Sequence, residues 1–213
     1  MNRGIILNLI QKDFRTYAQQ IAGTSLLILL FGMFTIFINS NTLGMFTSSS
    51  ASLICLVVII VFVPELQSRQ AWIQTASLPV SRKAMVRARF LTAIIIALGN
   101  LALWLVTFRI LDTIFHPENP TVIGVNDILY TGMYIFLNLS LYYLVFYRFH
   151  LIVVIGIHIL PTILWTLISQ GSTVLGDVIA AQPNLLLGWS VGIIGLFLLS
   201  FHSASTYFQK KNL

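Results

Sequence analysis

The sequence predicts an all-α integral membrane protein, and three observations support this fold class. Of 213 residues, 57% are hydrophobic and only 8% are charged, whereas a soluble domain carries about 25% charged residues. Apolar stretches of about 20 residues, the length that crosses a bilayer, recur along the chain. The basic residues gather between alternate stretches, as they do in the cytoplasmic loops of multispanning proteins. This pattern excludes an ordinary water-soluble globule.

Residues 1–20 precede the first apolar stretch and have the pattern of an amphipathic helix. Ile6, Leu9, Ile10, Phe14 and Tyr17 share one helical face, and basic and amide side chains lie on the rest of the surface. A helix of this kind can lie in the membrane interface with its apolar side among the headgroups. We therefore expect an interfacial helix, with a simple extension of the first span as the alternative.

Six membrane-spanning helices are expected within a single transmembrane domain covering residues 1–213. Their approximate ranges are 21–38, 45–63, 90–110, 128–147, 151–169 and 185–201. An even number of spans places both termini on the same side of the membrane. A cleavable signal peptide is not expected, because charged residues interrupt the N-terminal region and no short apolar core with a cleavage site follows.

The distribution of charge orients the six spans. Eleven of the 12 Lys and Arg residues fall on the side of the termini, and only Arg109 falls on the other side. The positive-inside rule then places both termini in the cytoplasm. The net charge of +6 is thereby explained by topology and by contact with membrane lipids, so no nucleic acid partner is expected.

The longest cytoplasmic segment covers residues 64–89 and has internal structure. A helical stretch carrying Trp72 is broken at Leu78–Pro79, and Ser81 can cap a basic helix that starts after the break. A basic loop beside a membrane usually serves topology and headgroup contact. Trp72 and Leu78 nevertheless need something apolar to cover them, which favours a protein partner.

Motifs for catalysis are absent from the sequence. There is no phosphate-binding Gly loop, so the chain cannot hydrolyse ATP by the P-loop route, and there is no zinc-protease motif or serine-hydrolase elbow. Cys55 is the single cysteine, and we expect no metal site. An intramembrane enzyme using Glu65, His116 or His150 is the least favoured alternative, because no two of these residues share a catalytic spacing.

The polar residues within the predicted spans include Asn100, Asn138 and His158. Such side chains most often form hydrogen bonds between neighbouring helices. An ion-coupled carrier usually needs an ionisable group at depth, and His158 is the only candidate. The alternative to a structural role is therefore a secondary carrier or channel with a polar path around these three residues.

An aromatic cluster ends the fourth predicted span. It comprises Tyr142, Tyr143, Phe146, Tyr147 and Phe149. Aromatic side chains are enriched where a membrane meets water. We expect this cluster to form an interfacial belt.

Together, these features resemble the ABC-2 type transporter permeases, in particular the small bacterial ones encoded apart from their ATPase. The resemblance covers nearly the whole chain as architecture. Its local motif is Glu65, Trp72 and the run Leu78-Pro79-Val80-Ser81-Arg82-Lys83, followed by Val86. It implies an ABC-2 (type V exporter-like) transmembrane domain in the bacterial cytoplasmic membrane.

The resemblance further implies a half-transporter that exports a peptide, antibiotic or lipid. Two permeases, either two copies or two related chains, would form the pathway, and two separate nucleotide-binding subunits would dock on the cytoplasmic side. ATP and Mg would be bound by those subunits, with no cofactor on this chain and no enzymatic activity of its own. The residues implied to contact the ATPase are Glu65, Arg69, Trp72, Leu78, Pro79, Arg82 and Lys83.

Overall fold

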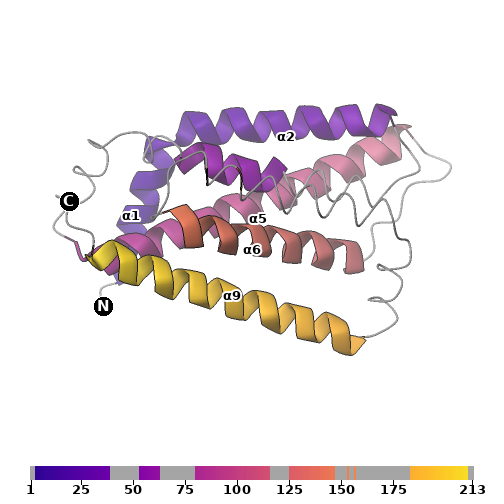
Figure 1. Cartoon of the computed structure of the whole chain (residues 1–213). Coiled ribbons are helices and arrows are strands. Elements are labelled where there is room, and N and C mark those ends of the chain that lie inside the picture. Colours follow the sequence, from indigo (N-terminus) through magenta and orange to yellow (C-terminus); the bar gives the residue numbers. More distant parts are fainter. Residues whose placement is uncertain are drawn as a thin grey trace.

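Figure 1 shows the computed structural model as a bundle of helices. It describes residues 3–38, 53–62, 80–115, 125–146, 153, 156 and 183–210. The labelled helices are α1 (Arg3–Thr16), α2 (Ala18–Ile38), α5 (Arg82–Phe115), α6 (Val125–Phe146) and α9 (Pro183–Lys210). A further apolar helix covers Leu53–Phe62.

Helices α1 and α2 meet at Tyr17, which lies between their assigned ends. The Tyr17 amide donates to the Asp13 carbonyl (2.9 Å), and the Ile21 amide donates to the Tyr17 carbonyl (2.8 Å). The chain nevertheless changes direction here: α1 crosses one end of the bundle, and α2 runs along its length (Figure 1). We call residues 13–21 the α1–α2 elbow.

Helix α5 is the central element, in contact with α1, α2 and α9. It begins at Arg82 because Ser81 caps it, as the sequence indicated: the Ala84 amide donates to the Ser81 hydroxyl at 3.3 Å. Its 34 residues correspond to about 50 Å of helix, whereas the hydrocarbon core is about 30 Å thick. Residues 82–89, the end of the predicted cytoplasmic segment, form its first turns.

Two of the described helices are long and apolar enough to cross a membrane, judged by length and composition. They are Arg82–Phe115 and Ser190–Tyr207, within α5 and α9. Shorter apolar helices cover Ala18–Leu30, Leu53–Phe62 and Thr131–Val145. The predicted fifth span lies outside the described residues, apart from residues 153 and 156.

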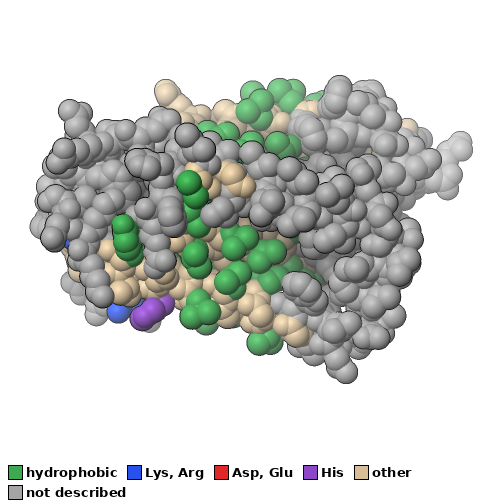
Figure 2. Space-filling model, viewed as in Figure 1, with side chains coloured by type: hydrophobic (Ala, Val, Ile, Leu, Met, Phe, Trp, Pro, Cys, Tyr) green, Lys and Arg blue, Asp and Glu red, His purple; other side chains and the backbone are tan. Residues whose placement is uncertain are grey.

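The outward faces of the long helices are apolar. Large exposed side chains include Leu26, Leu27 and Leu30 on α2; Leu91, Ile95, Leu98, Val106 and Ile110 on α5; and Val191, Ile194, Leu198 and Leu199 on α9. On the face drawn in Figure 2, hydrophobic side chains occupy the middle of the bundle, and blue and purple side chains lie at one end. Exposed apolar patches of this size are unusual on a soluble monomer.

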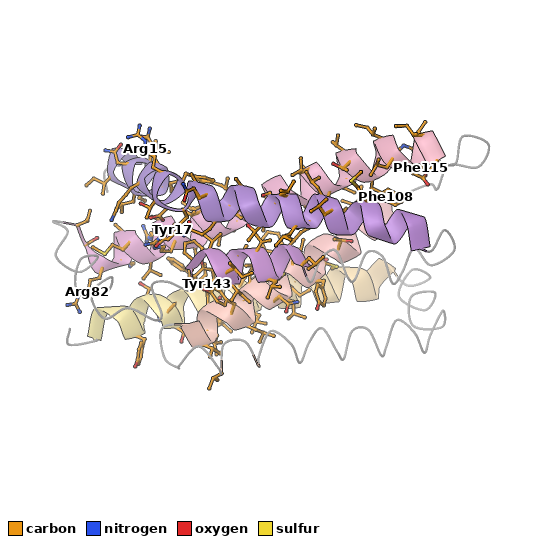
Figure 3. All side chains as sticks on the ribbon, turned by 90° about the horizontal axis from the view of Figure 1, so that it is seen from above. Arg15, Tyr17, Arg82, Phe108, Phe115 and Tyr143 are labelled. Atoms are coloured by element: carbon orange, nitrogen blue, oxygen red, sulfur yellow. The ribbon has the colours of Figure 1, made fainter. Side chains whose placement is uncertain are left out.

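The order of the helices places basic residues at one end of the bundle. Helices α2 and α5 start at this end, and α6 and α9 finish there, beside α1 (Figure 1). Figure 3 shows Arg15 and Arg82 at this end and Phe108 and Phe115 at the other. We call it the α1 end.

The apolar face of α1 packs on the protein. Leu9 and Phe14 lie against the hydrophobic core, and Tyr17 is part of it. The side chains left exposed on α1 include Leu7, Lys12 and Arg15. Contact with α5 and the core therefore covers part of this apolar face, while Ile6 and Ile10 remain partly exposed; the interfacial position of the helix stays a prediction.

Candidate functional site

A buried ion pair joins α1 to α5 at the α1 end. Arg89 Nη1 lies 2.8 Å from Asp13 Oδ1, and the two side chains are only 10% and 6% exposed. The Thr92 hydroxyl donates to the other carboxylate oxygen, Asp13 Oδ2, at 3.3 Å. Burying a charge is costly unless it is paired and hydrogen-bonded, and here both carboxylate oxygens have partners.

Two aromatic rings cover the guanidinium of Arg89. Its Cζ lies 5.6 Å from the centroid of Tyr17 and 5.3 Å from that of Phe62. The two rings also touch each other edge to face, with centroids 5.8 Å apart. Cation–π attraction is strongest where water is excluded, so the rings add to the ion pair and limit how the guanidinium can rotate.

Tyr143 connects the same place to α6. Its hydroxyl donates to the Arg89 carbonyl at 2.9 Å, and its ring stacks on Phe90 with centroids 3.8 Å apart. Tyr143 is 1% exposed and Tyr142 is 3% exposed. The prediction of an interfacial belt is wrong for these two residues; for Tyr143, a ring partner and a hydroxyl acceptor are both available inside the bundle.

These contacts form one cluster, which we call the Arg89 node: Asp13, Tyr17, Phe62, Arg89, Thr92 and Tyr143. Phe62 is the last described residue before the predicted cytoplasmic segment 64–89, and Arg89 is the last residue of that segment. Both ends of the segment therefore meet at the α1–α2 elbow. Figure 3 shows Tyr17 and Tyr143 near this junction.

The residues implied to contact an ATPase lie on or beside this segment. Glu65, Arg69, Trp72, Leu78 and Pro79 lie outside the described residues. Arg82 and Lys83 open α5, where Arg82 is partly buried and Lys83 is exposed. Their role stays a prediction.

Basic side chains surround the node on the outside. Lys12 and Arg15 are exposed on α1, and Lys83 is exposed on α5. Arg87 is partly buried, and its guanidinium lies 6.0 Å from the centroid of Phe201 on α9. The α1 end thus presents positive charge outward and keeps Asp13 inside.

Asn100 and Asn138 lie along the middle of α5 and α6, and both are buried. Their Nδ2 groups donate to carbonyls of their own helices, Ile96 (2.9 Å) and Tyr134 (3.0 Å). Within the described part of the chain, neither Oδ1 accepts a hydrogen bond. Among the described residues the amide donor of each is thus taken by the carbonyl one turn earlier, and the interhelical role stays a prediction; His158 lies outside the described residues.

Reasoning from the sequence missed the Arg89 node. It treated Asp13 as an interruption of the N-terminus and Arg89 as a topology charge. One signal was present: Asp13 lies four residues from both Leu9 and Tyr17, so it shares the apolar face of α1. An acid on an apolar face needs a buried cation, and Arg89 was the candidate nearest the apolar part of α5.

Comparison with known proteins shows one relationship. Residues 8–209 match a family described as ABC-2 family transporter protein. No curated protein and no solved structure is significantly similar to the chain.

Proposed function

The chain belongs to the ABC-2 family of transporter proteins, and on that premise we propose that it exports a hydrophobic or amphipathic substrate using ATP hydrolysed by a separate subunit. The family establishes an integral membrane transport subunit, a permease that generally pairs with an ATP-binding subunit. The family match over 8–209 carries the proposal, and it favours a permease over a secondary carrier or channel.

The sequence supports a separate source of energy. None of its 213 residues forms a P-loop. The proposal therefore assigns ATP and Mg to the partner, and the pathway to two permeases, either two copies of this chain or this chain and a related one. A peptide, antibiotic or lipid is the proposed class of substrate, by resemblance to the small permeases.

The geometry of α5 supports segment 64–89 as the docking element. The helix is longer than the hydrocarbon core is thick, and its first turns lie at the α1 end. Segment 64–89 leads into this part of the helix, whose first residues are Arg82 and Lys83. Because basic residues favour the cytoplasmic side, we place the α1 end in the cytoplasm, where an ATPase can reach it.

The test is whether an ATP-binding subunit is retained when the tagged permease is purified in mild detergent. An aromatic anchor at the centre of an interface commonly contributes about 2 kcal/mol or more, which corresponds to about 30-fold in affinity. We expect Trp72→Ala to lose most of the ATPase. The matched change Arg82→Ala, at the edge of the segment, should retain most of it, since a charge at the rim of an interface contributes about 0–1 kcal/mol.

The amount of ATPase per permease and the rate of ATP hydrolysis are the two measurements. If wild-type permease retains no ATPase, the proposed function is wrong. If Trp72→Ala leaves both quantities unchanged in a folded protein, segment 64–89 is a topology signal and the docking proposal fails.

A further inference from the structure

Two helices lead into and out of segment 64–89: Leu53–Phe62 and the first turns of α5. We call them its stems. We infer that Asp13 and Arg89 are positioning residues that make α1 move together with these stems during the transport cycle. This inference rests on the proposed function, because it requires an ATPase that moves the segment. The ion pair is then the connection through which movement of the segment reaches the α1–α2 elbow and hence α2.

The contacts of Arg89 support this role because they come from both stems and from the elbow. On α5, Arg89 belongs to the stem that follows the segment; Phe62, which covers its guanidinium at 5.3 Å, belongs to the stem that precedes it. Asp13 and Tyr17 come from the elbow. If either stem is displaced, the contact between Asp13 and Arg89 must therefore either break or pull α1 in the same direction.

The chemistry of the contact also suits a mechanical connection better than general packing does. Apolar contacts are non-directional, whereas a buried ion pair depends on the distance between two particular groups and leaves an uncompensated charge when it opens. The two oxygens of Asp13 are held separately, by Arg89 and by Thr92. The pair therefore resists both separation of α1 from α5 and rotation of α1 about its own axis.

Helix α6 contacts α5 independently of the ion pair. Tyr143 donates to the backbone carbonyl of Arg89, not to its side chain, so it anchors α5 without depending on the ion pair. Neutralising the pair should release α1 and leave the packing of α5 on α6 in place. A variant of Asp13 thus separates the connection from the scaffold.

The experiment measures two distances by spin labels in the purified permease–ATPase complex, with Cys55→Ala as the background. Gln11→Cys reports α1, Leu91→Cys reports the first turns of α5, and His202→Cys on α9 is the common reference; all three positions are exposed. Each distance is measured without nucleotide and after trapping with ATP, Mg and vanadate. In the wild-type background, we expect trapping to shift both distances.

In Asp13→Asn, we expect the Leu91–His202 shift to remain and the Gln11–His202 shift to be lost. Arg89→Gln should do the same, because it removes the opposite charge of one pair. The double variant Asp13→Asn/Arg89→Gln leaves no unpaired buried charge, so we expect it to assemble even if a single variant fails to, and it should show the same loss. Lys12→Gln removes an exposed charge beside Asp13 and should behave as wild type.

Three outcomes overturn the inference. If both shifts persist in the double variant, the pair only stabilises the fold and does not transmit movement to α1. If ATPase is retained but trapping shifts neither distance in the wild-type background, there is no movement for the pair to carry, and the proposed function still stands. If no ATPase is retained by the wild-type permease, the proposed function fails and the inference fails with it.

Discussion

At the Arg89 node, buried polar side chains bond to other helices, whereas along the middle of the bundle Asn100 and Asn138 bond to their own. The node joins α1 to α5 by an ion pair and α6 to α5 by a hydroxyl. Each asparagine instead donates to the carbonyl one turn earlier and leaves its Oδ1 without a partner among the described residues. The comparison shows where polar chemistry sets the arrangement of helices in this protein.

The difference has a physical cause in the kinds of side chain involved. A buried charge costs free energy unless another group compensates it, and the partner of Asp13 comes from a different helix, so this pair ties two elements together. A neutral amide finds an acceptor in its own backbone and can stay on one helix. The middle of the bundle therefore relies on apolar packing, including the stacked pair Trp104 and Phe108, and the α1 end relies on directed contacts.

The largest effect is expected for Arg89→Ala. Removing one partner of a buried ion pair leaves the other charge unpaired, which costs about 3–5 kcal/mol. The matched change Arg87→Ala, two residues earlier and partly exposed, should cost about 0–1 kcal/mol. Thermal unfolding in detergent measures both; equal losses would show that the node is no stronger than the surface charge beside it.

A smaller effect is expected for Thr92→Val, which keeps the shape of the side chain. Its hydroxyl donates to the carboxylate of Asp13 in the buried node, and a hydrogen bond to a charged group contributes about 1.5–3 kcal/mol. Thr113→Val is the control, because that exposed hydroxyl donates to the Arg109 carbonyl of its own helix. We expect Thr113→Val to change the free energy of unfolding by less than about 0.5 kcal/mol; a control loss as large as that of Thr92→Val would remove the distinction between the two kinds of contact.

The smallest effect is expected for Asn138→Leu and Asn100→Leu. Each substitution loses one hydrogen bond within a helix but also removes a buried carbonyl oxygen that has no partner in the described residues, so the net change should lie within about 1 kcal/mol of zero. Unfolding of the purified permease and its assembly with the ATPase are the measurements. A loss above about 2 kcal/mol would mean that an Oδ1 is satisfied in the assembled protein, and the middle of the bundle would then resemble the node.

Several elements of the fold were predictable because their signal is local. The cap at Ser81 follows from a hydroxyl placed before a helical run. The apolar stretches within α5 and α9 follow from their composition alone. The clustering of basic residues at one end of the bundle also follows. Two predicted spans separate Arg15 from Arg82, and an even number of spans returns the chain to the same end.

The contacts of the site were harder to predict because they depend on which surfaces meet. The pattern of α1 showed an apolar face, but the same face fits a lipid surface and a protein surface equally well. Tyr143 had the composition and position of an interfacial residue, and only the approach of Phe90 and the Arg89 carbonyl makes it a core residue.

The sequence by itself therefore determined that this chain is helical, lies in a membrane, and keeps its positive charge at one end, because transfer free energies and charge asymmetry add up along the chain whatever the packing. Only the tertiary structure decided which groups Asp13 meets there: Thr92, 79 residues away in the chain, and Arg89. That choice depends on the angle at which α1 crosses α5, and this angle follows from the change of direction between α1 and α2 at Tyr17. The angle is set by the fit of many side chains at once, and no local pattern records it.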